Sequence, residues 1–292
     1  MNKIFALGFF DGVHLGHQAL LSACCRMARE RGAEPWAITF DRHPQALFAA
    51  QPPKLINETA QRVALLRSYG MAQVVIYPVT EQTMAKPWEA FLEELIAQGA
   101  AGFVCGSDFR FGCRGEGTAQ KLQAYCTENG LACAIVEQQT MKGIRISSTH
   151  IRALLEAGDM AEANAFLGHH YLLTGQVVEG RGLGRTIGIP TANLQIPENV
   201  IVPKYGVYAC KAFVDDKEYF AVTNVGTRPT VGGHRVTVEP WLLDFTGDLY
   251  GKTITLQFYE FLRPEKKFDS LGQLQAEIQK NALQTREIFE KS

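Results

Sequence analysis

Apolar and amphipathic segments alternate along the first half of the chain. Residues 3–9 form a short, continuous apolar run, which is typical of a strand buried on both faces. In residues 16–32 the apolar positions recur on one stripe, which predicts an amphipathic helix. The same patterns predict strands at 34–40, 72–79, 102–106 and 132–138, with helices at 59–70, 87–99 and 118–130. Strands and helices that alternate at this spacing predict a doubly wound parallel sheet.

The pattern changes after Gly168, where two short predicted helices, 147–158 and 160–168, come to an end. The chain then becomes β-rich, with alternating segments at 171–180, 205–214, 217–226, 235–245 and 252–262. Turns at Gly, Asp or Pro separate these segments and favour an antiparallel sheet or a small barrel. Residues 270–292 predict a long closing helix. We therefore expect two domains, residues 1–168 and 169–292.

Composition narrows the class of protein further. Hydrophobic residues make up 46% of the 292 residues and charged residues 20%, a balance typical of globular proteins. Lys and Arg total 29 against 30 acidic residues, so no basic surface for nucleic acid is expected. No apolar run approaches the ~18 residues of a membrane helix, so no membrane partner is expected. The seven cysteines form no C-x-x-C pair, which indicates reduced thiols and predicts a cytoplasmic protein. None of these features sets the oligomeric state.

The first candidate for chemistry is the stretch FFDGVHLGH, which presents His14 and His17 on either side of Gly16. A zinc site is disfavoured, because the H-E-x-x-H motif spaces its histidines by four and places Glu beside the first. A structural histidine pair remains open. Phosphate binding fits better, because Gly16 allows close approach and the following helix offers free N–H groups. Two imidazoles could also donate hydrogen bonds to a phosphoryl oxygen.

A second candidate is the stretch ISSTHIR, in which Ser147 and Ser148 precede a helical pattern. One serine is expected to cap the helix, which leaves the other hydroxyl and Thr149 for an anion. Arg152 follows in the same helix and could clamp a phosphate. A simple capping motif is the alternative for this stretch when it is considered alone.

Together, H-x-G-H and S-S-T-x-I-R resemble the signature of the nucleotidylyltransferase superfamily. The longer strings GFFDGVHLGH, TFDRHP and GSDFRFG resemble the adenylyltransferase half of bacterial bifunctional riboflavin kinase/FAD synthetases. This resemblance implies that FMN attacks the α-phosphorus of ATP and releases pyrophosphate, with His14 and His17 stabilising the transition state. The implied ATP-binding residues are Gly8, Phe9, Asp11, Gly16, Ser148, Thr149 and Arg152, and the implied flavin-binding residues are Asp108, Phe109 and Arg110.

The second half offers GRGLGRTIGIPTANL, a glycine-rich segment that leads into Thr191 and Asn193. Flexible glycines can close over a nucleotide, and a hydroxyl and an amide are neutral oxygen ligands for Mg²⁺ that is shared with phosphate. A plain turn is the alternative. In RVTVEPWLLDF, Glu239 lies among bulky apolar residues and could accept a hydroxyl proton, or it could be an exposed strand carboxylate.

GRGLGRTIGIPTANL, KYGVYA, NVGTRPT, VEPWLLDF and DLYGK follow the order seen in riboflavin kinases, which fold as a compact β-barrel with a trailing helix. This resemblance implies that Thr191 and Asn193 lie at Mg-ATP and that Glu239 is the base for the terminal ribityl hydroxyl. Gly180, Gly182 and Gly184 would form the nucleotide flap. Trp241, which stands where many relatives carry His, would contact the flavin.

The leading hypothesis is therefore a bifunctional enzyme that converts riboflavin to FMN and FMN to FAD, with ATP and Mg²⁺. Two alternatives stay open at this point. The chain could retain only one of the activities, or it could bind flavin without turnover. The intact His14, His17 and Glu239 argue against a pure carrier, because binding alone needs no general base.

Overall fold

A computed structural model of the chain describes residues 2–180, 184, 188–230 and 233–291. The chain divides into two compact units, Met1–His150 and Ile151–Ser292. The helix α6 (Ser148–Ala157) crosses this division, and α7 (Met160–Leu167) follows it. The predicted boundary between residues 168 and 169 lies just after α7 and stays a prediction.

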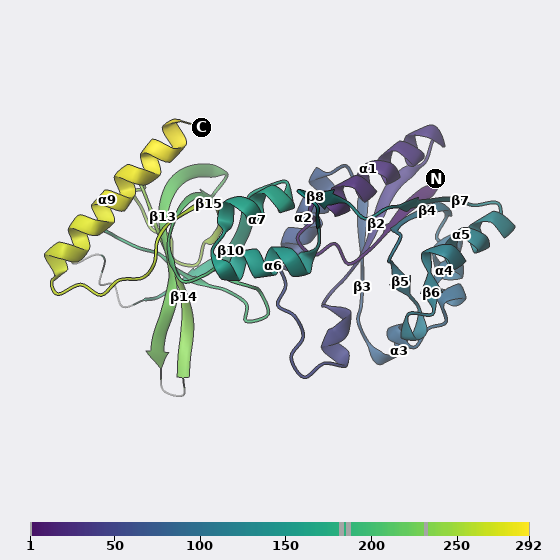
Figure 1. Ribbon diagram of the computed structural model, residues 1–292, viewed down its shortest axis with the longest axis horizontal. Coiled ribbons are helices and arrows are strands. Elements are labelled where there is room, and N and C mark those ends of the chain that lie inside the picture. Colours follow the sequence, from purple (N-terminus) through teal and green to yellow (C-terminus); the bar gives the residue numbers. More distant parts are fainter. Residues whose placement is uncertain (1, 181–183, 185–187, 231–232, 292) are drawn as a thin grey trace. The chain divides into compact units, whose positions relative to one another are not determined.

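The first unit is built on a parallel sheet with the strand order β3-β2-β1-β4-β7 (Figure 1). Its strands are β1 (Lys3–Leu7), β2 (Glu34–Phe40), β3 (Gln73–Tyr77), β4 (Ala100–Gly106) and β7 (Ala132–Val136). The helices of this unit are α1 (Leu15–Glu30), α2 (Thr59–Ser68), α3 (Glu81–Met84), α4 (Trp88–Ala97) and α5 (Ala119–Glu128). The predicted doubly wound sheet is confirmed.

Short elements outside the five-stranded sheet were not expected from the sequence. They are the hairpin β5 (Arg110–Phe111) and β6 (Gly117–Thr118), the hairpin β8 (Thr140–Met141) and β9 (Ile144–Arg145), and 3₁₀ turns at Pro44–Leu47 and Cys113–Gly115. Each of these strands has two residues, which is too short for a period-2 pattern to be visible.

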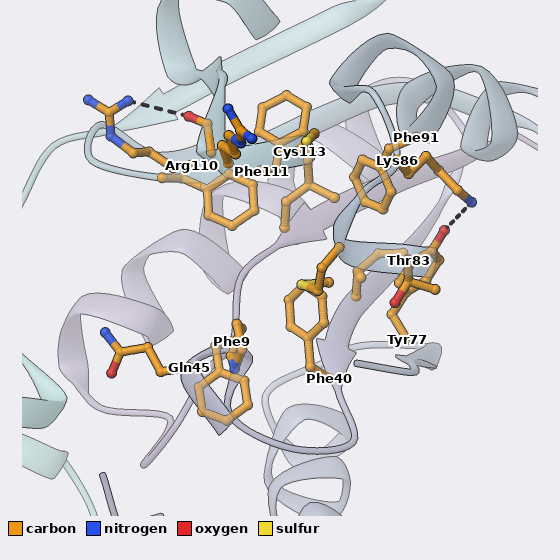
Figure 2. A pocket seen from close by; sticks show the side chains of 18 of the residues that line it. Phe9, Phe40, Gln45, Tyr77, Thr83, Lys86, Phe91, Arg110, Phe111 and Cys113 are labelled. Atoms are coloured by element: carbon orange, nitrogen blue, oxygen red, sulfur yellow. Dashed lines mark hydrogen bonds between the residues drawn. The ribbon is translucent and has the colours of Figure 1, made fainter. Parts of the chain in front are cut away.

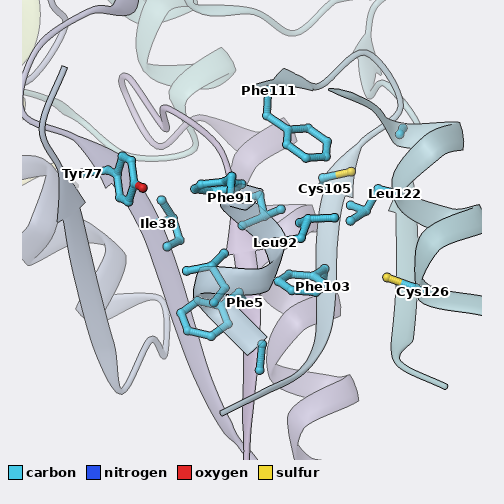
Figure 3. Close-up of a cluster of buried hydrophobic side chains, with 14 residues drawn as sticks. Phe5, Ile38, Tyr77, Phe91, Leu92, Phe103, Cys105, Phe111, Leu122 and Cys126 are labelled. Atoms are coloured by element: carbon cyan, nitrogen blue, oxygen red, sulfur yellow. The ribbon is translucent and has the colours of Figure 1, made fainter. Parts of the chain in front are cut away.

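Helices pack on both faces of the central strand β1, which explains why consecutive residues of this strand are apolar. Phe5 and Leu7 of β1 face a cluster with α4 and α5, whereas Ile4 and Ala6 face a second cluster with α1 and α2. Figure 3 shows the first cluster, in which Phe103 is completely buried. Alternate residues therefore pack against different helix layers, as expected for a parallel sheet buried on both sides.

The strand order places a topological switch at β1, because β2 lies on one side of this strand and β4 on the other. In open parallel sheets, ligands bind beyond the carboxyl ends of the strands at such a switch. The turn that joins β1 to α1, residues 8–14, lies at this point and is called the β1–α1 turn below.

The second unit is a closed antiparallel barrel with the order β10-β11-β14-β13-β12-β15. Its strands are β10 (Tyr171–Val178), β11 (Asn193–Gln195), β12 (Gly206–Val214), β13 (Lys217–Thr230), β14 (Gly233–Leu242) and β15 (Thr253–Arg263). The helix α9 (Leu271–Glu290) follows, and its Phe289 stacks on Phe220 of β13, with 4.6 Å between ring centroids. Of the two predicted arrangements, the barrel with a trailing helix is the one present.

We predict that Phe103→Ala lowers the free energy of unfolding of the first unit by about 3–5 kcal/mol, because the ring is completely buried and leaves a cavity. Urea denaturation followed by circular dichroism measures the change. Ile76→Ala is the matched control on the edge strand β3, where the side chain is 46% exposed. A loss at Phe103 no larger than the loss at Ile76 would contradict this packing.

Candidate active sites

The β1–α1 turn has an unusual backbone. Phe10 and Val13 have φ values of 59° and 40°, and Gly12 between them has φ of 82°. Non-glycine residues rarely adopt this left-handed region, and such strain gathers where surrounding packing holds a functional conformation in place. Both strained side chains are completely buried, which supplies that packing.

His14 and His17 meet at the N-terminus of α1. His14 is the N-cap residue, and its Nδ1 accepts the backbone N–H of His17 at 3.3 Å. The two rings stack with 3.7 Å between centroids and 13° between planes. Because Nδ1 of His14 is an acceptor, the proton of its neutral ring lies on Nε2. A Cβ at Gly16 would lie 3.3 Å from the His14 ring, so a side chain at this position would crowd the ring.

His17 is held neutral by its surroundings. Burial lowers its pKa well below the usual value, and the charges of His14 and Arg62 lower it further. Its Nδ1 is buried and has no hydrogen-bond partner among the described residues. A neutral imidazole still has one N–H to donate, so His17 can serve as a hydrogen-bond donor near neutral pH.

Asp11 fastens the β1–α1 turn to the segment before α2. Its Oδ1 accepts the backbone N–H groups of Ile56 at 2.9 Å and Asn57 at 3.3 Å. The side chain is only 1% exposed. These contacts explain the local fold, and the ATP-binding role of Asp11 stays a prediction.

The second motif reaches the same turn. Ser148 Oγ donates a hydrogen bond to the carbonyl of Asp11 at 2.9 Å. Ser147 Oγ accepts the N–H of His150 at 3.2 Å, so Ser147 caps α6 as one of the two serines was expected to do. Thr149 is exposed, and Arg152 lies further along α6. The two motifs are therefore joined by a direct hydrogen bond, although 137 residues separate its partners.

A cavity of about 1120 Å³ opens beyond the carboxyl ends of the strands (Figure 2). It is large enough for a flavin or a nucleotide, since ligand pockets typically measure about 300–1,000 Å³. The predicted residues Gly8, Phe9, Asp108, Phe109 and Arg110 all line it. Asp108 is ion-paired with Arg145, and Arg110 donates to the carbonyl of Gly115 at 3.4 Å.

Several residues that line this cavity were not expected from the sequence. They are aromatic or cationic and include Phe40, His43, Tyr77, Lys86, Phe91 and Phe111. Lys86 Nζ donates to Tyr77 Oη at 2.7 Å, and Tyr77 Oη donates to Glu94 at 2.8 Å. Phe40 and Tyr77 end their strands. Ligands of parallel sheets bind beyond the carboxyl ends of the strands. The position at a strand end is therefore the sequence signal that could have identified these two residues.

In the second unit, Thr191 and Asn193 line a cavity of about 250 Å³, together with Gly180 and the segment 245–250. A Cβ at Gly180 would lie 2.1 Å from Asn193 Nδ2, and a Cβ at Gly184 would lie 3.2 Å from Thr191 Oγ1. A side chain at position 180 would therefore displace the Asn193 amide, and one at position 184 would also lie 2.1 Å from the backbone carbonyl oxygen of Ile189. Gly182, the third predicted flap residue, lies outside the described residues.

Glu239 lies on β14, opposite Asn224 of β13, and is ion-paired with Arg228. Burial raises the pKa of Glu239, and the nearby Glu265 adds to this, whereas Arg228 and Thr237 oppose it. Among the described residues, Glu239 is not part of the lining of the 250 Å³ cavity. It lies on the strand next to β11, where the N–H of Ala192 donates to the carbonyl of Pro240 at 2.9 Å.

Trp241 follows Glu239 by two residues and is half-buried. It packs against a small core cluster formed by Val207, Val222, Leu243 and Ala282. The flavin-binding role of Trp241 stays a prediction.

The chain matches two family models. The model described as FAD synthetase matches residues 1–150, and the model described as riboflavin kinase matches residues 167–289. Together, these two ranges contain all the candidate site residues described above except Arg152. The alternative of a single retained activity is not supported, because both models match.

Relatives with assigned functions match over nearly the full length. The bifunctional riboflavin kinase/FMN adenylyltransferase of Listeria monocytogenes is 34% identical over 100% of this chain and 94% of the relative. The protein of the same name from Escherichia coli K12 is 35% identical over 98% of this chain and 92% of the relative.

Among solved structures, one described as a macrolide-efflux protein from Streptococcus pneumoniae has a TM-score of 0.88 and 30% identity, covering 98% of this chain and 94% of that one. That description names a transport protein, whereas both family models and the curated relatives name flavin enzymes. In the described part of this chain, no helix has the length and apolar character to cross a membrane. With both halves matched in order, the chain belongs to the family of bifunctional riboflavin kinase/FMN adenylyltransferases.

Proposed function

We propose that the two activities of the family use separate sites in this chain, the adenylyltransferase site at the β1–α1 turn and the kinase site around Thr191, Asn193 and Glu239. The observation that carries the first assignment is the hydrogen bond from Ser148 to the Asp11 carbonyl, which joins the two nucleotide-binding motifs. The 1120 Å³ cavity beside the turn supports it further.

In adenylyl transfer, a phosphate oxygen of FMN attacks the α-phosphorus of ATP, and the bond from that phosphorus to pyrophosphate breaks. Negative charge grows on the α-phosphoryl oxygens, and N–H donors at the N-terminus of α1 stabilise it. His14 and His17 are the side-chain donors in this proposal. Gly8, Phe9, Asp11 and Gly16 shape the nucleotide site, and Ser148, Thr149 and Arg152 hold the β- and γ-phosphates.

We assign the flavin of this reaction to the cavity beyond the strands, with Asp108, Phe109 and Arg110. Its aromatic lining suits a planar ring system, because offset-stacked and edge-to-face contacts favour aromatic partners. Phe109 and Phe111 already stack with 5.5 Å between ring centroids and 14° between planes.

In the kinase reaction, the terminal ribityl hydroxyl oxygen of riboflavin attacks the γ-phosphorus of ATP, and ADP leaves. Glu239 accepts the hydroxyl proton. The raised pKa of Glu239 brings this carboxylate closer to neutral pH and makes it a better base than an exposed glutamate. The ion pair with Arg228 fixes its orientation.

Thr191 and Asn193 suit a magnesium ion that is bound together with ATP. They offer a hydroxyl and an amide oxygen, and both line the 250 Å³ cavity together with Gly180. When bound, Mg²⁺ would neutralise charge on the phosphate oxygens. Gly180 and Gly184 lie in the segment that we assign to the nucleotide flap, and we assign Trp241 to the flavin.

We place the enzyme in the cytoplasm, where its substrates and products are ATP, riboflavin, FMN, FAD and pyrophosphate. All seven cysteines are free thiols, which fits a reducing compartment.

His17→Asn is predicted to lower kcat for FAD formation from FMN by roughly 100- to 1,000-fold, the usual cost of removing one donor to a transition state. Formation of FMN from riboflavin should be unchanged. Chromatography of the flavins over time measures both rates, and His169→Asn serves as a control outside both sites. Loss of both activities in a folded variant would contradict separate sites.

Glu239→Gln is predicted to lower kcat for FMN formation by roughly 100- to 10,000-fold, because the general base is removed. Adenylylation of supplied FMN should survive, as should both activities of Glu260→Gln, a control on an exposed strand position. In the unchanged enzyme, kinase activity should fall with decreasing pH as Glu239 becomes protonated, and this fall should begin above the usual range for glutamate. An unchanged kinase rate in Glu239→Gln removes the residue from this role.

Asn193→Ala is predicted to raise the Mg²⁺ concentration that gives half-maximal kinase activity by roughly tenfold or more. The reason is the loss of an oxygen ligand. Titration of Mg²⁺ at fixed ATP measures the effect, and Asn199→Ala provides an exposed asparagine as the control. Equal Mg²⁺ dependence in both variants would argue against Asn193 as a ligand.

A further inference from the structure

Arg62 of α2 is completely buried, although arginine is rarely found in a protein interior. Its Nε donates to Thr39 Oγ1 at 3.0 Å, and one terminal nitrogen donates to the carbonyl of Phe40 and to Thr59 Oγ1. The other terminal nitrogen, Nη1, is buried with no hydrogen-bond partner among the described residues. All three acceptors are uncharged, so a buried positive charge is kept without a directly bonded carboxylate.

Burial lowers the pKa of Arg62 to about 10, and the carboxylates of Asp11 and Asp41 oppose this shift. The guanidinium therefore stays charged at neutral pH. Keeping an incompletely paired charge in the interior costs free energy. A buried charge next to a reaction site is a candidate for a role in that reaction.

Arg62 is linked to the β1–α1 turn through Thr39. The hydroxyl of Thr39 accepts from Arg62 Nε and donates to the carbonyl of Phe9 at 2.7 Å. The guanidinium also lies over the Phe9 ring, with Cζ 4.5 Å from the ring centroid. Both the backbone and the side chain of Phe9 are thus fixed immediately before the strained residues of the turn.

A second attachment lies in the same region. Asp11 accepts two backbone N–H groups from Ile56 and Asn57, which precede α2. Asn57 is completely buried, and its Oδ1 has no hydrogen-bond partner among the described residues. The other unsatisfied buried atoms in these segments are His17 Nδ1 in α1 and Arg62 Nη1 in α2, among the described residues.

The charge of Arg62 also acts on His17. The groups that lower the pKa of His17 by their charge are His14, in the same turn of chain, and Arg62, on α2. The carboxylates within electrostatic reach of Arg62 are Asp11 and Asp41. A positive charge on His17 would face both Arg62 and the stacked ring of His14, so the neutral form is favoured.

We propose that Arg62 is a positioning residue for adenylyl transfer, which fixes the β1–α1 turn through Thr39 and Phe9 and keeps a permanent positive charge within electrostatic reach of His17. The proposal deepens the adenylyltransferase site and rests on the role of His17 given above. Arginine suits this position because its planar fork bonds several acceptors at once and stays charged when buried.

The variants separate the effect of the positive charge of Arg62 from the effect of its guanidinium hydrogen bonds. Arg62→Lys keeps the charge, Arg62→Met removes the charge and the guanidinium hydrogen bonds, and Thr39→Val removes the hydroxyl that joins Arg62 Nε to the Phe9 carbonyl. Arg67→Met, an exposed arginine on the same helix, is the matched control. Each full-length variant is assayed for kcat and KM of FMN adenylylation, with its kinase rate as an internal reference.

His17 is observed separately by NMR of protein labelled with ¹³C-histidine, its resonance identified with His17→Asn. We expect Arg62→Met to raise the pKa of His17 toward its usual value, whereas Arg62→Lys and Thr39→Val leave it low. All three should lower kcat for FAD formation, by about 100-fold in Arg62→Met, because small displacements of catalytic groups cost this much. Arg67→Met and all kinase rates should be unchanged.

An unshifted His17 titration in folded Arg62→Met, or an unchanged kcat in Thr39→Val, overturns the proposal. If Arg62→Met does not fold, Arg62→Lys and Thr39→Val decide it through the kcat of adenylylation. Failure of the underlying assignment looks different, because His17→Asn would then retain FAD formation whatever the Arg62 variants do.

Discussion

The seven residues between β1 and α1 are held by hydrogen bonds that join distant parts of the first unit. Phe10 and Val13 adopt left-handed backbone angles there, which the chain would not keep without support from its surroundings. Ser148 Oγ bonds the Asp11 carbonyl, and the Asp11 carboxylate bonds the backbone before α2. These contacts come from three distant parts of the sequence. The positions of His14 and His17 therefore depend on the complete unit and not only on the local H-x-G-H motif.

The two candidate sites differ in the chemical groups that they contain. In the first, the N-terminus of a helix and two stacked histidines offer N–H donors, and burial keeps His17 neutral. In the second, a barrel carries a hydroxyl and an amide beside glycines that leave no space for a Cβ. The carboxylate of Glu239 lies on a neighbouring strand, and burial raises its pKa. Donors suit a transition state that gains negative charge, whereas a base suits the removal of a proton.

Much of the fold was predictable because its signals are local. The strand β1 is an apolar run because it is buried on two faces. The helix α1 is amphipathic because it is buried on one face. The two-residue hairpins at Arg110–Phe111 and Thr140–Met141 were not predictable, because no periodic pattern exists at that length. Lys86 was missed as a lining residue because only the folded unit brings it to the cavity with Phe9 and Asp108.

The sequence by itself determined the two-part architecture, because the periodic patterns of buried strands and amphipathic helices are local. It also supplied candidate site residues through short motifs such as H-x-G-H and P-T-A-N. Tertiary structure alone decided how these groups behave. The neutral state of His17, the buried charge of Arg62 and the raised pKa of Glu239 all arise from burial among residues distant in sequence. Desolvation depends on everything that surrounds a group in space, and a linear sequence does not contain that information until the chain has folded.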